Sequence, residues 1–346
     1  MSTGLKVVSQ GAYASIQDMG RIGFRRFGVP WSGVLDRRLM RIANHLVGNE
    51  ETAPVIECFD GGQQFAAANA SLRLAIAGNA VIEVEDDAGR RQIASWRSFI
   101  LVPGQSLRIA RISPGRIGVL AVSGITVPAV MASASTYARA ALGGLHGRAL
   151  QAGDEVGASA ATAGAGRMLA QTPVPAVGAI RVVAGPQRDH FDSSAWSTFT
   201  SSDYKISATA DRMGVRLDGP PLGHLARYGH EIVSDATMPG SIQIPGNGLP
   251  VVLLADAQTA GGYPKIATVI SADLARVAAS PPGSTIRFTA VGAHEGERIA
   301  RDEERLTRAL LEAIRTARGE GFDLDALYSG NLIDGVVNAL SPEQSR

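Results

Sequence analysis

Short apolar runs separated by glycine and proline dominate the first half of the chain. In segment 71–84, Leu72 and Leu74 begin an alternation of apolar and polar residues that resumes after a Gly-Asn pair. Further strand-like runs cover 91–111 and 115–125. Turn residues recur roughly every 8–12 positions, which is typical of an all-β barrel or sandwich.

Two segments instead show the spacing of an amphipathic helix. Segment 34–49 has Asp36 as a candidate N-cap, and its apolar residues fall on one helical face: Leu39, Ile42, Ala43, Leu46 and Val47. Segment 297–318 has an apolar stripe and a charged opposite face. We expect this second helix to dock on its own domain or on a neighbouring protein.

The composition changes in the middle of the chain. Residues 157–177 are rich in Ala, Gly, Thr and Pro with one charge, as in a linker. The segment around Asp18 (17–30) weakly resembles 210–221, which leaves a duplicated β domain and coincidence equally open. The predicted division is an N-terminal β domain, a linker, a C-terminal β domain and a helical tail, at 1–156, 157–177, 178–292 and 293–346.

Composition and charge narrow the class of protein. The chain has 346 residues and a net charge of +1, so two domains are expected and a nucleic-acid or anionic-membrane surface is not. The single cysteine, Cys58, excludes a disulfide framework and fits a reducing cytoplasm. The six histidines have no metal-binding spacing, and no signal peptide or membrane helix is visible. We therefore expect a cytoplasmic globular protein without a metal site.

Two clusters of polar residues lie in the N-terminal half. The first, 16–38, places candidate binding groups among glycines before a helix: Asp18, Arg21, Ser32 and Asp36. This loop either binds an anion or amide near a helix N-terminus or is held together by an Asp–Arg pair. In the second, Asn44 and Asn49 are candidate amide ligands, although Asn49 fits a helix C-cap equally well.

The third cluster, 240–265, places Gln243, Gln258 and Tyr263 at strand ends and finishes with Lys265 after a Gly-Gly-Tyr-Pro turn. The chain has three lysines against thirty arginines, so a lysine in this turn favours a role that needs a compact amine. The alternative is an ordinary surface ion pair.

These segments carry a family resemblance. "IQDMGRIGFRRFGVPWSGVLDRRLMRIANHLVGN", "ADRMGVRL" and "PGSIQIPGNGLPVVLLADAQTAGGYPKIATVISADL" occur in that order within roughly residues 5–292. Together they resemble the biotin-dependent carboxyltransferase-like family. That family includes allophanate hydrolase subunit 2, the C subunit of bacterial 5-oxoprolinase, the carboxyltransferase domain of urea carboxylase and the Kip-type antagonist. The resemblance implies a mainly β fold of two tandem cyclophilin-like β-barrel domains with few helices.

The resemblance also implies partners and three alternative functions. The first is a subunit of an ATP-dependent 5-oxoprolinase, working with a subunit 1-type protein (like the B subunit of 5-oxoprolinase) and a protein like the A subunit of lactam utilisation. The second is a carboxyltransferase acting on urea or a related amide, with biotin on a separate carrier because this chain lacks a biotinylation segment. The third is a Kip-type regulator that sequesters a subunit 1-type partner.

For amide or lactam chemistry, the candidate residues divide by role. The candidate catalytic residues are Lys265, Asp18 and Asp36. The candidate substrate-binding residues are Arg21, Ser32, Asn44, Gln243, Gln258 and Tyr263. ATP is the expected cofactor, at a site in this chain or shared with a partner subunit.

Overall fold

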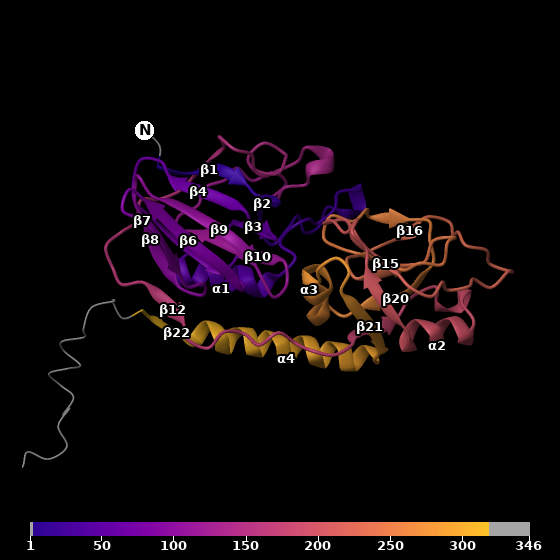
Figure 1. The fold of residues 1–346 in the computed structure, drawn as a ribbon. Helices are drawn as coiled ribbons and strands as arrows, with labels where there is room; N and C mark the ends of the chain where they lie inside the picture. The colour runs from indigo at the N-terminus through magenta and orange to yellow at the C-terminus, as the bar shows by residue number, and fades with distance from the viewer. Residues whose placement is uncertain (1–2, 318–346) are drawn as a thin grey trace, which may run out of the picture.

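The computed structural model describes residues 3–317, and the first half of this range forms two packed β-sheets (Figure 1). The six-stranded sheet runs β11 (Glu155–Gly157), β1 (Gly4–Gln10), β4 (Gln63–Ala67), β9 (Ser106–Ile112), β6 (Ala80–Asp86), β7 (Gly89–Ile93). The five-stranded sheet runs β2 (Tyr13–Gln17), β3 (Val55–Phe59), β10 (Ile117–Val122), β5 (Leu72–Ala77), β8 (Ser98–Leu101).

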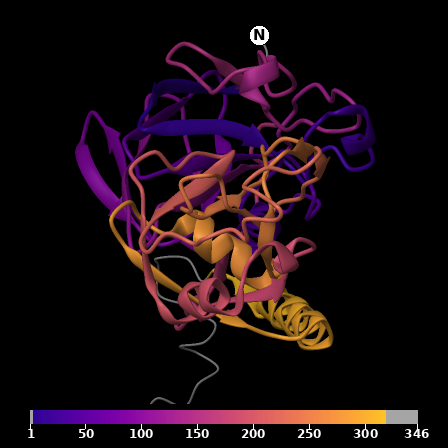
Figure 2. The same ribbon diagram turned by 90° about the vertical axis from the view of Figure 1, so that its right-hand side faces the viewer.

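The second half closes into a seven-stranded barrel, which lies nearest the viewer in Figure 2. Its strand order is β13 (Ile180–Ala184), β20 (Lys265–Val269), β17 (Ser241–Gln243), β18 (Val251–Leu253), β15 (Gly214–Asp218), β14 (Asp203–Ile206), β21 (Thr285–Ala290). Two small sheets lie outside it: β16 (Asp235–Ala236) with β19 (Ala260–Gly261), and β12 (Arg167–Leu169) with β22 (Ile314–Thr316).

Four α-helices are found within residues 3–317: α1 (Arg37–Val47), α2 (Ser193–Ser201), α3 (Ser271–Ala279) and α4 (Ala293–Glu312). Three short 3-10 turns accompany them: η1 (Arg25–Phe27), η2 (Ala138–Ala140) and η3 (Arg188–His190). The helix α4 contacts α1, α3 and β13, so it runs along both halves of the molecule (Figure 1).

Strand β10 shows how the two halves share a hydrophobic core. Every residue of β10 is buried, because one face of the strand meets the six-stranded sheet and α1 packs against it as well. Leu120 and Val122 join the apolar cluster of the N-terminal half, whereas Val119 and Ala121 join the cluster that continues through α1 into the barrel. Burial on two faces explains why this segment reads as a continuous apolar run rather than an alternation.

The sequence prediction of a mainly β fold is confirmed. The C-terminal half forms the expected closed barrel, but the strands of the N-terminal half form two sheets. The turn at Gly78, with φ 115°, shows the reason. It carries the chain from β5 in one sheet to β6 in the other, so the two halves of segment 71–84 do not pair with each other.

The predicted helix at 34–49 is confirmed as α1. The Asp36 carboxylate accepts a hydrogen bond from the backbone N–H of Leu39 at 3.0 Å, as an N-cap does. The predicted helical tail begins with α4, and residues 318–346 lie outside the described range. Within that range, no helix has the length and apolar character required to cross a membrane.

The cap gives a test of Asp36, a candidate catalytic residue. We expect Asp36→Ala to lower the free energy of unfolding by about 1 kcal/mol, because the Leu39 N–H loses its acceptor. Asp36→Asn keeps an accepting oxygen and should stay close to the wild type. Urea denaturation measures both variants. Equal stability of the alanine variant and the wild type would contradict the capping role.

The predicted linker gives a second test. Residues 157–177 contain β12, which pairs with β22, but the part that follows is open to solvent: Val174 is 85% and Val177 is 91% exposed. We expect limited proteolysis to cut first between 170 and 178, since exposed loops without strand pairing are preferred sites. Mass spectrometry of the first fragments identifies the cut. Earlier cleavage within 71–125 would contradict the predicted division.

Candidate functional site

Lys265 is the first residue of β20 rather than the tip of a turn, and its side chain is only 2% exposed. Its Nζ lies 2.7 Å from Oδ2 of Asp235, a residue whose side chain is 48% exposed. The side-chain amide of Gln187 donates to the same carboxylate oxygen at 3.1 Å. These two donors, Lys265 first, hold the pKa of Asp235 below its ordinary value. The buried amine of Lys265 therefore contacts a carboxylate that is itself partly exposed to solvent.

Gln243 and Gln258 lie close to Lys265. Gln243 is the cross-strand partner of Lys265, and its Oε1 accepts a hydrogen bond of 3.3 Å from Gln258 Nε2. The Nε2 of Gln243 is buried and has no partner. A Cβ at Gly261 would lie 2.5 Å from this nitrogen, so a side chain there would displace the Gln243 amide. The result is a pre-positioned amide donor beside a lysine.

These glutamines open onto a cavity of about 520 Å³. Gln243, Gln258 and the 40% exposed Tyr263 line it on the outer face of β15, β17 and β18. The N-terminal half contributes Arg139, which lies 3.5 Å from Asp211 of the barrel half. The cavity is therefore formed where the two halves meet. We call this cavity, together with Lys265 and Asp235, the glutamine site.

The loop containing η1 reaches the glutamine site through Arg25. Arg25 donates to the backbone oxygens of Thr237 and Gln258, and its guanidinium lies 5.3 Å from the ring centroid of Trp31. Its Nη1 is buried without a partner. Arg25 is therefore a second unpaired donor contributed from the opposite half of the molecule.

Asp18 and Arg21 lie in the same loop but bind the segment around Ser135. Four groups donate to the Asp18 carboxylate, from Gly20 N, Ser133 Oγ, Ala134 N and Ser135 Oγ. Arg21 is fully buried and donates through Nη2 to the backbone oxygen of Ser135. Burial lowers the pKa of Arg21, against the opposing charges of Asp18 and Asp256. Its Nε and Nη1 are unpaired. Asp18 therefore holds the loop against the Ser135 segment, whereas Arg21 keeps two N–H groups without acceptors.

The other predicted site residues are dispersed. Ser32 and Asp36 line a second, larger cavity, and Asp36 is occupied as the cap of α1. Asn44 is fully buried, and its amide donates to the backbone oxygens of Glu51 and Ala53. Neither Lys265 nor Asp18 lines either cavity, so the candidate catalytic residues Lys265, Asp18 and Asp36 do not share one.

A buried ion cluster joins the halves behind the glutamine site. Arg212 pairs with Glu57 from β3 and holds Asp256 through Nε and Nη2, each at 3.1 Å. Burial raises the pKa of Glu57, while the charge of Arg212 opposes this effect. Burial would lower the pKa of Arg212, but the two carboxylates keep it above its ordinary value. The guanidinium is therefore charged and fixed between both halves.

Sequence reasoning brought Lys265, Gln243 and Gln258 into one candidate set, and the structure brings them together. It missed Asp235, Gln187 and Arg25, because no local motif marks their contacts. The weak internal resemblance at 210–221 contains Arg212, one member of the ion cluster. Among the described residues, no group of three or more His, Cys, Asp or Glu side chains is arranged to hold a metal ion.

Comparison with known proteins gives a consistent result. A family model described as "Carboxyltransferase domain, subdomain A and B" matches residues 27–290. The C subunit of 5-oxoprolinase from Escherichia coli (strain K12) is 35% identical over 310 residues, covering 87% of this chain and 96% of that protein. The corresponding 5-oxoprolinase protein of Haemophilus influenzae, also a C subunit, is 37% identical over 297 residues, covering 84% and 92% respectively.

Among solved structures, the K. lactis urea amidolyase is similar with a TM-score of 0.79 and 26% identity. The match covers 89% of this chain but only 20% of that much longer chain. The chain therefore spans nearly the whole length of the bacterial relatives and about a fifth of the amidolyase.

The ion cluster gives a stability prediction. We expect Arg212→Met to lower the free energy of unfolding by about 3–5 kcal/mol, because it leaves the Glu57 and Asp256 carboxylates buried without a countercharge. Arg298→Met, at a 63% exposed position on α4, is the control and should change stability by at most about 0.5 kcal/mol. Chemical denaturation measures both. A similar decrease in the free energy of unfolding in both variants would contradict the proposed contribution of the cluster to stability.

Proposed function

Because the chain belongs to the family of carboxyltransferase domains with subdomains A and B, we propose that it is the C-type subunit of a 5-oxoprolinase-type complex. Such a complex opens the lactam ring of 5-oxoproline to glutamate at the expense of ATP. The observation that carries this proposal is the match over 96% of the length of the Escherichia coli protein, a C subunit of 5-oxoprolinase. A subunit implies partners, and we propose two, which resemble the B and A subunits of such a complex.

The glutamine site supports this proposal with suitable chemistry. Hydrolysis of a lactam requires that the carbonyl oxygen be polarised and that the ring nitrogen receive a proton. The unpaired Nε2 of Gln243 is a donor for the carbonyl oxygen. The Lys265 ammonium, held by Asp235, is the proton donor for the nitrogen. Arg25, which reaches Gln258 and has an unpaired N–H group, suits the substrate carboxylate.

The proposal also includes a role for ATP and, for carboxyl transfer, for biotin. ATP is a co-substrate of the complex, with its site in this chain or shared with a partner subunit. The unpaired amide and guanidinium donors also fit the ureido oxygen or carboxylate of a biotin group. Biotin would have to arrive on a separate carrier protein.

A second candidate function is carboxyl transfer to urea or a related amide. The observation that favours it is the structural likeness to urea amidolyase over 89% of this chain. The same donors would then hold the acceptor amide. The two functions separate by their requirements, because carboxyl transfer needs a biotinylated carrier whereas lactam opening needs 5-oxoproline and ATP.

Lys265 offers the sharpest test. In a complex reconstituted with its partner subunits, we expect Lys265→Arg to lower 5-oxoproline-dependent ATP hydrolysis by about 100-fold or more, because arginine does not release a proton at neutral pH. Lys205→Arg is the matched control, since Lys205 is an exposed lysine on β14, and its activity should be unchanged.

Circular dichroism and thermal melting show whether the two variants are folded. Full activity in a folded Lys265→Arg variant would leave the lysine as a structural ion-pair partner of Asp235. No 5-oxoproline-dependent ATP hydrolysis by the wild-type complex would contradict the proposed function itself, and activity with a biotinylated carrier and urea would favour carboxyl transfer.

A further inference from the structure

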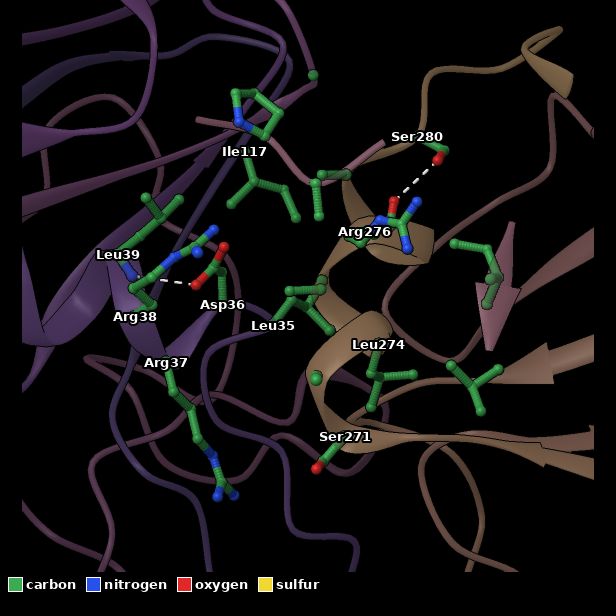
Figure 3. A pocket seen from close by; sticks show the side chains of 18 of the residues that line it. Leu35, Asp36, Arg37, Arg38, Leu39, Ile117, Ser271, Leu274, Arg276 and Ser280 are labelled. Atoms are coloured by element: carbon green, nitrogen blue, oxygen red, sulfur yellow. Dashed lines mark hydrogen bonds between the residues drawn. The ribbon is translucent and has the colours of Figure 1, made fainter. Parts of the chain in front are cut away.

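A second cavity, of about 1260 Å³, lies between the two halves and shares no lining residue with the glutamine site. The N-terminal half contributes the loop before α1 and the first turn of that helix. The barrel half contributes α3, and α4 closes one side. Figure 3 shows these walls, with Arg37 and Leu35 facing Ser271 and Leu274 across the opening. The cavity therefore exists only because the two halves dock.

Seven arginines line this cavity, and six of them are matched by carboxylates: Arg38, Arg41, Arg116, Arg181, Arg276 and Arg287. Arg37 is the exception within the described residues. Its side chain is exposed and lines the cavity, and no carboxylate of the described residues forms an ion pair with it. One cation is therefore left without a countercharge inside a partly enclosed space.

Further donors without partners face the same space. Ser32 is 5% exposed, and its hydroxyl has no hydrogen-bond partner. The Nε of Arg38 is buried and unpaired as well. The helix α3 starts here without a side-chain cap, and Ser271, its first residue, lines the cavity. Helix starts, arginines and hydroxyls are the groups that bind phosphate oxygens.

The acidic residues of the cavity do not oppose an anion at this end. Asp36 accepts a hydrogen bond from the Leu39 N–H, and the three other acidic residues of the lining are paired with arginines: Glu303 with Arg38, Glu304 with Arg41 and Asp203 with Arg287. Apolar side chains provide surface for the rest of a ligand: Leu35, Ile117, Leu274 and Trp96. In Figure 3, Arg37 and Ser271 reach from opposite walls toward the same edge of the view.

We propose that this interdomain cavity binds a phosphorylated small molecule of nucleotide size. Arg37, Ser32 and the start of α3 hold its phosphate, and the apolar wall around Leu35 and Leu274 holds its organic part. The site is separate from the glutamine site. It rests on the proposed function in one respect, because it gives the nucleotide of that reaction a location in this chain.

The experiment measures binding to the full chain alone by isothermal titration calorimetry. The probes are ATP, AMP, ribose 5-phosphate, inorganic phosphate and adenosine, of which adenosine lacks a phosphate. We expect at least one phosphorylated compound to bind with a dissociation constant below about 1 mM. If ATP or AMP binds more tightly than ribose 5-phosphate, the ligand class is a nucleotide. If ribose 5-phosphate binds more tightly, the ligand class is a sugar phosphate.

Three variants locate the site. Arg37→Gln should weaken binding by about tenfold or more, since it removes a charged donor. Ser32→Ala should weaken binding without lowering the melting temperature, because the hydroxyl has no partner in the protein. Arg305→Gln, at a 77% exposed position on α4 outside the cavity, is the control and should bind as the wild type does.

Two results would overturn the proposal. One is the absence of binding by every phosphorylated probe. The other is binding that does not change in folded Arg37→Gln and Ser32→Ala, or that is equally strong for adenosine. Because no turnover is measured, either result leaves the proposed 5-oxoprolinase role untouched.

Discussion

The contact on which the rest of the structure depends is the guanidinium of Arg212. It is 6% exposed and lies between Glu57 of the N-terminal half and Asp256 of the barrel half. Burying three charges is costly, and the cost is met only when every donor and acceptor is matched. Here Arg212 also donates to the backbone oxygen of Gly33, and Glu57 accepts from the Leu35 N–H. The halves therefore have one well-defined relative position.

This position creates both cavities. The segment before α1 that Glu57 and Arg212 hold carries Ser32 and Leu35, which line the larger cavity. The segment after Asp256 carries Gln258, which lines the smaller one. A rotation of one half against the other would alter both at once, because a single ion cluster fixes the two walls. A shared fixed point of this kind preorganises polar groups that come from different domains.

Local features were predictable because their causes lie within a few residues. The spacing of apolar positions predicted α1, and Asp36 caps it as expected. The alternating runs predicted strands, and the Gly-Gly-Tyr-Pro turn marked Lys265 as a candidate. Even so, the partners of Lys265 were not predictable: Asp235 is 30 residues away and reaches the lysine only because the β16–β19 pair places it there.

The sequence by itself determined the mainly β fold, the position of the first helix, the family and the choice of Lys265, Gln243 and Gln258. Only the tertiary structure decided that Asp18 and Asn44 bind neighbouring backbone segments, that the N-terminal half forms two sheets, and that Arg212 joins the halves. Glu57 and Arg212 are 155 residues apart. Periodicity and turn chemistry act between neighbours, whereas the pairing of buried charges depends on which strands the closed barrel brings beside the other half.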